Sequence, residues 1–136
     1  MALYFNNQYA DTVWIAFVYL DPNCSPTHFR KIGWWQVNSG DNFNAWDTNL
    51  RTVNQYAAFY AEEYRDEGGA TWGGNGNNWY LIPELGFDQC YDDNTNCTRQ
   101  PNFALLDFNG APNCTVTIGR AAGHFDVEAW ISVDPG

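Results

Sequence analysis

The chain has 136 residues, a formal net charge of −10 and a pI near 4.2. This length suits one domain, and an aromatic content of 18% excludes a disordered chain, because disorder requires low hydrophobicity. Only six residues are Lys or Arg, so the chain lacks the positive charge that proteins use to hold nucleic-acid phosphates. We therefore expect no nucleic-acid partner.

The N-terminal residues lead directly into polar sequence. Leu3-Tyr4-Phe5 is followed by Asn6-Asn7-Gln8, without a basic segment or a long apolar run, so no secretory signal peptide is predicted in this chain. The longest apolar run, residues 13–20, is far shorter than the ~20 residues that span a bilayer. No transmembrane segment is expected.

Good helix formers are scarce, whereas β-branched and aromatic runs separated by turn residues recur along the whole chain. Residues 56–64 fit a strand, with a helix as the alternative, because their apolar positions suit both periods. Strands are predicted at residues 3–5, 12–19, 31–37, 42–46, 56–64, 79–82, 103–108, 114–118 and 125–133.

The first long strand and the last differ in pattern. Residues 12–19 are β-branched or aromatic almost throughout, which predicts a strand buried on both faces. Residues 125–133 alternate strictly, which predicts one wet face that carries Trp130 beside Asp126 and Glu128. Many short strands at regular spacing, without βαβ units or repeats, indicate an all-β fold. We expect a single domain over residues 1–136, an antiparallel β-sandwich of Greek-key or jelly-roll type.

The four cysteines are Cys24, Cys90, Cys97 and Cys114, and none stands in a Cys-x-x-Cys pair, so structural zinc is not expected. An even count in polar loops favours two disulfides, and four cysteines allow three pairings. We predict Cys90–Cys97 as a local staple and, by elimination, Cys24–Cys114. The alternative is four free thiols in a cytosolic protein. Disulfides would place the protein outside the cell or on its surface.

Several segments resemble a known family. Four segments follow one another along the chain. They are the predicted strand at 13–19, the motif Gly33-Trp34-Trp35-Gln36-Val37, the Tyr-rich strand at 56–62 and the motif Trp72-Gly73-Gly74. In this order they resemble the bacterial domain-of-unknown-function family 1036, over about the first two thirds of the chain. The resemblance implies a small exported or envelope-associated domain and brings no catalytic residues.

The chain also departs from that family pattern. Asn6 stands where the family has a Cys, and Asp41-Asn42 stands where the family has a Cys after Gly. The resemblance therefore implies no disulfide pairing for this chain.

Motifs of known catalytic chemistry are missing from the sequence. It contains no Gly-x-Ser-x-Gly, no phosphate-binding glycine loop followed by Lys and no His-Glu-x-x-His. Adjacent carboxylates such as Glu62-Glu63 point to opposite faces of a strand and are poor acid–base partners. We expect a protein that is not an enzyme and needs no cofactor.

A weak calcium candidate is the loop that contains Asp92, Asp93 and Asn94, with a solvated acidic turn as the simpler interpretation.

The clearest functional signal is a loop bracketed by two tryptophans. Between Trp72 and Trp79 lie only Gly and Asn, including Asn75, Asn77 and Asn78. Aromatic faces stack on sugar rings, and amides and carboxylates bond sugar hydroxyls. Glycines would let the backbone approach a ligand closely. The loop therefore predicts a carbohydrate-binding site, with a long hairpin turn as the structural alternative.

Two further candidates share this chemistry. Trp46 stands beside Asp47, and Trp130 lies on the wet face of the last strand. Trp14, Trp34 and Trp35 lie in apolar strands and are expected in the core. The sequence thus predicts a lectin-like module that binds a glycan or cell-surface polysaccharide.

The alternative function is a self-assembling extracellular structural or filament subunit. Tyr and Trp are common interface anchors, so a homo-oligomer would fit this composition. The short strand at residues 3–5 could then pair with the sheet edge of a neighbouring copy.

Overall fold

The computed structural model describes residues 3–46, 56–63, 69–74, 76–107 and 111–130, except the side chains of Trp46, Tyr56 and Trp130. Its described residues contain strands and no helix, so no helix there is long and apolar enough to cross a membrane. The strands are β1 (Leu3–Asn7), β2 (Val13–Leu20), β3 (Phe29–Val37), β4 (Asn42–Trp46), β5 (Tyr56–Glu62), β6 (Thr71–Trp72), β7 (Ile82–Pro83), β8 (Phe87–Cys90), β9 (Cys97–Arg99), β10 (Ala104–Asp107), β11 (Asn113–Ile118) and β12 (Phe125–Trp130).

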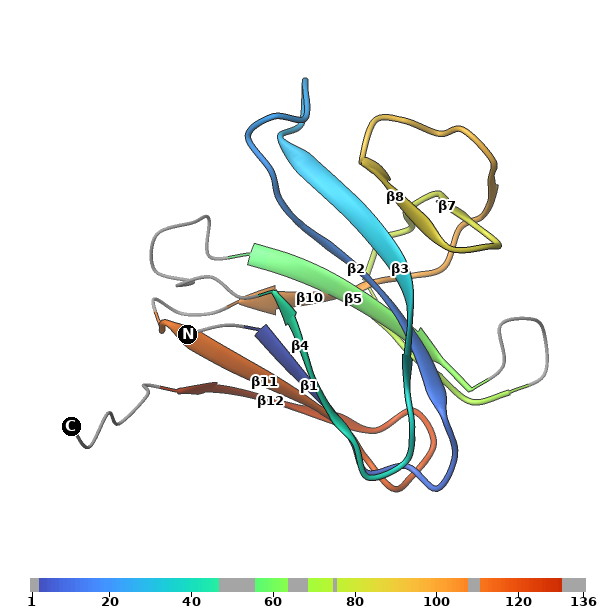
Figure 1. The fold of residues 1–136 in the computed structure, drawn as a ribbon, viewed down its shortest axis with the longest axis vertical. Coiled ribbons are helices and arrows are strands. Elements are labelled where there is room, and N and C mark those ends of the chain that lie inside the picture. Colours follow the sequence, from blue (N-terminus) through green and yellow to red (C-terminus); the bar gives the residue numbers. More distant parts are fainter. Residues whose placement is uncertain (1–2, 47–55, 64–68, 75, 108–110, 131–136) are drawn as a thin grey trace.

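The strands form two main sheets, which lie against each other in Figure 1. The smaller sheet has the order β12-β11-β1-β4, and the larger has the order β10-β5-β2-β3-β8 with β6 paired to β5. Strands β7 and β9 form a separate two-stranded sheet. All pairs are antiparallel except β1 with β11. The predicted all-β, sandwich-like fold is confirmed.

Strand β1 lies inside the smaller sheet. It pairs in parallel with β11, where Phe5 faces Val116, and antiparallel with β4, where Phe5 faces Phe43. Both of its edges are therefore hydrogen-bonded within the chain. The suggestion that residues 3–5 could pair with a neighbouring copy is wrong, because no edge of β1 remains available.

The main core lies between the two sheets and is built by period-2 alternation. In β5, Ala57, Phe59 and Ala61 point into this core, whereas Ala58 and Tyr60 point to the opposite face. The smaller sheet contributes Leu3, Phe5, Cys114, Val116 and Ile118. Phe5 packs against Phe59 with ring centroids 5.6 Å apart.

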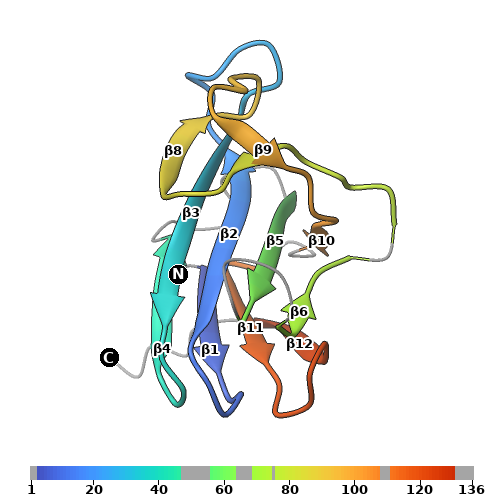
Figure 2. The same ribbon diagram turned by 90° about the vertical axis from the view of Figure 1, so that its right-hand side faces the viewer.

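A second cluster lies on the outer face of the larger sheet, under residues 76–103, which we call the covering segment. Figure 2 shows this segment passing from β6 around the sheet to β8 and back to β10. Its Ile82 and Phe103 are buried against Val18, Ala58 and Tyr60 of the sheet. The larger sheet is therefore covered on both faces, which explains the two buried faces predicted for residues 12–19.

The predicted strands are mostly present, with shifted ends. Residues 56–64 form a strand, β5, rather than a helix, and β3 begins two residues before its predicted start. The predicted strand at 79–82 is wrong, because only an isolated bridge at Trp79 and the short β7 occur there. Strands β6, β8 and β9 were not predicted.

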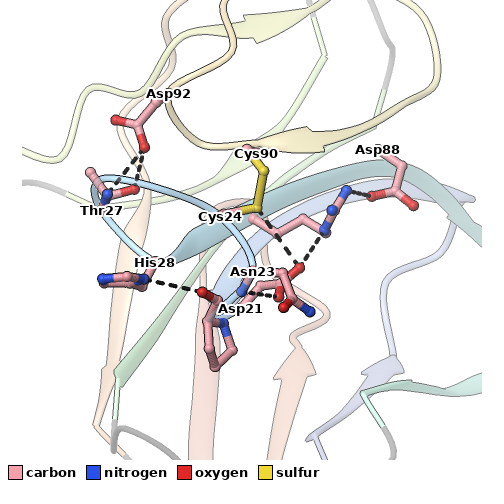
Figure 3. The surroundings of a disulfide bond; sticks show 10 residues. Asp21, Asn23, Cys24, Thr27, His28, Asp88, Cys90 and Asp92 are labelled. Atoms are coloured by element: carbon pink, nitrogen blue, oxygen red, sulfur yellow. Dashed lines mark hydrogen bonds and ion pairs between the residues drawn. A yellow bond between two sulfur atoms is a disulfide. The ribbon is translucent and has the colours of Figure 1, made fainter.

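The disulfide joins Cys24 to Cys90, so the predicted pairs Cys90–Cys97 and Cys24–Cys114 are both wrong (Figure 3). The β3–β8 register places Cys90 opposite Arg30, close to the loop before β3 that carries Cys24. Cys97 and Cys114 are free thiols. Cys114 cannot reach Cys24, since β11 directs it into the core between the sheets.

Candidate functional site

Backbone and side-chain hydrogen bonds tie the loop 76–80 to residues 100–103. The side chain of Asn102 joins the two segments, since its Nδ2 donates to the Gly76 carbonyl at 2.8 Å and its Oδ1 accepts from the Asn78 amide at 3.3 Å. Phe103 N donates to the Asn78 carbonyl, and Tyr80 N to that of Pro101, at 2.9 and 3.2 Å. These hydrogen bonds fix the conformation of the loop, so a ligand that binds to it pays little conformational entropy for ordering it.

Trp79 is the exposed aromatic residue of this loop. Its side chain is 54% exposed, while its carbonyl accepts a hydrogen bond from Gln100 Nε2 at 3.3 Å. It borders an open hollow of about 370 Å³, which we call the Trp79 hollow. Tyr60, Thr71 and Asn102 also line this hollow, together with Gly73 and Gly74. Hydroxyl and amide groups thus lie beside a flat aromatic face.

Gly73 and Gly74 serve the packing of the chain. A Cβ on Gly73 would collide with the carbonyl oxygen of Asn102, and one on Gly74 with that of Phe103. Gly74 N also donates to the Asn102 carbonyl at 3.0 Å. The predicted close approach of this glycine backbone to a ligand is therefore, in the structure, a close approach to residues 102–103.

Two further hollows continue from the first, one after the other. One of about 500 Å³ shares Gly73, Gly74 and Gly123 with the Trp79 hollow and reaches Asn78 and Leu105. We call it the middle hollow.

The other hollow, of about 330 Å³, shares Leu105 with the middle hollow and is lined by the rings of Phe29, Tyr80 and Tyr91. We call it the tyrosine hollow. Tyr80 and Tyr91 meet edge to face there, with centroids 5.4 Å apart. Burial raises the pKa of Tyr80, so its hydroxyl stays protonated well above neutral pH.

Among the described residues, no charged side chain lines any of these three hollows. A fourth hollow, of about 690 Å³, is different, because Glu84, Asp88 and Asp93 line it. In a chain with 16 acidic residues, the contrast marks the three connected hollows as a surface suited to uncharged ligands.

Tyr60 lines the Trp79 hollow and is held by the ion pair between the buried Glu62 and the half-buried Arg99. Its hydroxyl donates to Glu62 Oε2 at 3.2 Å, and Arg99 forks onto both oxygens of Glu62 at 2.5 and 2.7 Å. Burial, followed by the nearby Glu62 charge, raises the pKa of Tyr60 to about 12. The hydrogen bonds that Arg99 donates to the Glu62 carboxylate are the main cause that raises the pKa of Arg99. The Tyr60 side chain is therefore uncharged at neutral pH and held in one position where it lines the hollow.

The structure separates the two tryptophans of the predicted loop. Trp72 is completely buried in the main core, opposite Ala61 on β5 and edge-on to Tyr9 at 4.8 Å between centroids. It presents no face to a ligand, so the prediction that Trp72 binds ligand is wrong. Trp79 is exposed, as a ligand-stacking residue must be.

The remaining predicted ligand residues have different environments. Asn77 is exposed, whereas Asn78 is half buried and its backbone carbonyl is bonded to Phe103 N. Asn75, Asp47 and the side chains of Trp46 and Trp130 lie outside the described residues.

The weak calcium candidates Asp92, Asp93 and Asn94 each bond a different neighbour. Their partners are Thr27, Thr95 and Lys31, respectively. The Thr95 hydroxyl, which donates to Asp93 at 2.6 Å, is the main cause that lowers the pKa of this carboxyl. The part of the chain that the structure describes holds no group of three or more His, Cys, Asp or Glu placed to share a metal ion.

Sequence reasoning missed much of the site. Thr71, Asn102, Tyr80, Tyr91 and Leu105 join it only through the fold. Asn102 lies 24 residues from its partner Asn78, so only the path of the covering segment brings them together. No local pattern could have signalled this pairing.

No protein-family model, curated protein or solved structure matches this chain. These comparisons neither support nor contradict the resemblance to the domain-of-unknown-function family 1036, which stays a prediction. The function must therefore be inferred from the site itself.

Proposed function

We propose that the protein is a non-enzymatic carbohydrate-binding module that acts outside the cell or at its surface. The observation that carries the proposal is Trp79, an exposed aromatic ring on a hydrogen-bonded loop beside an uncharged hollow. The Cys24–Cys90 disulfide is compatible with an extracellular location.

The geometry suits a sugar ring. An exposed indole face attracts the C–H groups of a pyranose, and the hydroxyl of Thr71 and amide of Asn102 can exchange hydrogen bonds with sugar hydroxyls. The Asn102 amide is already oriented by its bonds to Gly76 and Asn78, so little ordering is needed on binding.

The test is a glycan array, followed by calorimetry with the sugars that bind. Trp79→Ala should weaken binding about tenfold or more, because aromatic side chains that a ligand covers on binding carry much of the binding energy. Trp79→Phe should keep most of the affinity, since a ring remains. Leu85→Ala is the matched control, because Leu85 is 72% exposed and lies in the acidic fourth hollow.

An array that stays blank, both without and with added calcium, would contradict the proposal. So would glycan binding that Trp79→Ala leaves unchanged, because the ligand would then lie elsewhere.

Strand β12 favours a second candidate function, self-assembly into an extracellular structural subunit. Within the described residues it pairs only with β11, and Val127 on it is exposed. Such an edge can add a strand from a second copy. Light scattering after size-exclusion chromatography at two concentrations separates the functions: assembly that sugar does not change supports the structural role, and a monomer at both concentrations opposes it.

A further inference from the structure

We infer that the ligand is an uncharged glycan chain of several sugar units, which runs from the Trp79 hollow through the middle hollow into the tyrosine hollow. This inference rests on the proposed function and names the class of glycan. A module for a single terminal sugar would need only the Trp79 hollow.

Shared walls make the three hollows one continuous surface. Gly73, Gly74 and Gly123 line both the Trp79 hollow and the middle hollow, and Leu105 lines both the middle and tyrosine hollows. Strand β6, which directly precedes Gly73 and Gly74, and strand β10, which carries Leu105, both pair with β5 (Figure 2). Leu105 is 57% exposed and stands at the junction, where a chain would cross it.

The far end offers a second set of rings. The tyrosine hollow places Tyr80, Tyr91 and Phe29 around one space, as the Trp79 hollow offers its indole. These rings are held in place: Tyr80 packs on Phe103 at 5.1 Å between centroids, and Tyr91 N donates to the Phe29 carbonyl at 2.8 Å. Tyr91 also follows the disulfide-bonded Cys90. Prepositioned rings at two ends suit a ligand with repeated sugar units.

The negative charge of the protein favours neutral glycans over acidic ones. Uncharged side chains and backbone line all three hollows among the described residues, and the chain as a whole carries a net charge of −10. A uronic-acid or sulfated chain would meet this negative field, and no Lys, Arg or His among the described residues lines the hollows to pair with it. A neutral chain meets no such penalty.

Calorimetry with sugars of two lengths tests the inference. The probes are cello-, xylo-, manno-, malto- and chito-oligosaccharides of two and six units, with hexagalacturonic acid as the charged counterpart. At least one neutral hexasaccharide should bind tenfold or more tightly than its disaccharide, and more tightly than hexagalacturonic acid. Leu105→Arg should reduce the hexasaccharide affinity tenfold and the disaccharide affinity by a smaller factor, because only the longer chain must cross Leu105 to reach both ends of the surface.

Leu85→Arg is the matched control, because it adds the same charge to an exposed leucine of the acidic hollow. It should change neither affinity. Equal affinity for two and six units, preference for the charged hexamer, or no effect of Leu105→Arg would overturn this inference and leave the proposed function intact. Failure of every sugar to bind would overturn both.

Discussion

Two cysteines remain free in the protein, and their surroundings differ sharply. Cys114 is buried between the two sheets, and burial raises the pKa of its thiol to about 12. Cys97 is half exposed on β9, where its sulfur lies 3.4 Å from the Lys31 ammonium and 3.4 Å from Gln89 Oε1. Only Cys97 is accessible to a reagent in the folded protein.

We therefore predict one reactive thiol in the native protein and two after unfolding. A chromogenic thiol reagent at pH 8 should label Cys97 alone in buffer and both cysteines in guanidinium, because Cys114 is shielded and protonated. Cys97→Ser should remove the native reaction.

The number of reactive thiols in the unfolded protein tests the disulfide pairing. Reduction in guanidinium before labelling should raise this number from two to four, since Cys24 and Cys90 then become free. If unfolded protein that has not been reduced contains no reactive thiol, the Cys24–Cys90 pairing with two free cysteines is contradicted.

The tryptophans show how far a sequence identifies individual functional residues. Trp72 and Trp79 bracket one Gly/Asn loop and look equivalent in the sequence. Strand β6 pairs with β5 and turns Trp72 into the core, whereas the loop held by Asn102 leaves Trp79 outside. The composition of the loop predicted an exposed aromatic residue, but only tertiary pairing decides which tryptophan it is.

At the scale of elements, buried charges fasten the covering segment to the larger sheet. Glu62 on β5 and Arg99 on β9 form a forked ion pair, and Arg99 also stacks over the Trp34 ring at 5.2 Å. Lys31 on β3 is buried and donates to the Leu81 carbonyl at 2.7 Å. These contacts position the rings that line the tyrosine hollow.

We predict that Arg99→Met destabilises the protein by about 3–5 kcal/mol, because it leaves the Glu62 carboxylate buried without its partner. The double variant Glu62→Leu with Arg99→Met should recover much of this loss, since neither charge of this ion pair is then left without its partner. Urea unfolding followed by circular dichroism measures both.

The exposed pair Arg30–Asp88 provides the control. Asp88 is 59% exposed, so Asp88→Asn should change the free energy of unfolding by less than about 1 kcal/mol. A double variant as unstable as Arg99→Met alone would contradict the proposed role of the ion pair, because packing rather than charge would then explain the loss.

The same elements show which strands a sequence can predict. Strands β2, β5 and β12 have five or more residues and show apolar runs or alternation that are readable locally. Strands β6 to β9 have two to four residues, too few for a period, and the ion pair and disulfide around them depend on distant partners. The missed β8 is also why the disulfide pairing was wrong.

For the molecule as a whole, the two hydrophobic clusters share strands. In β5, Phe59 belongs to the main core and Tyr60 to the outer cluster, and in β2 the same holds for Phe17 and Val18. Loss of either cluster would expose one face of both strands. We therefore expect both clusters to unfold in one cooperative transition.

Alkaline pH tests this cooperativity, because each cluster contains a group whose pKa is raised to about 12 in the folded chain. The pKa of Cys114 in the main core rises from 9.0 to about 12, and that of Tyr60 in the outer cluster from 10.0 to about 12. Between pH 9 and 12 for Cys114, and between pH 10 and 12 for Tyr60, the unfolded chain releases a proton that the folded chain retains. Stability is therefore full below pH 9 and falls as pH rises, by about 1.4 kcal/mol per pH unit for each group within its own range. Urea titrations at several pH values should give one transition, and Tyr60→Phe and Cys114→Ala should each reduce the slope. Two separate transitions, each sensitive to one variant, would show that the clusters unfold independently.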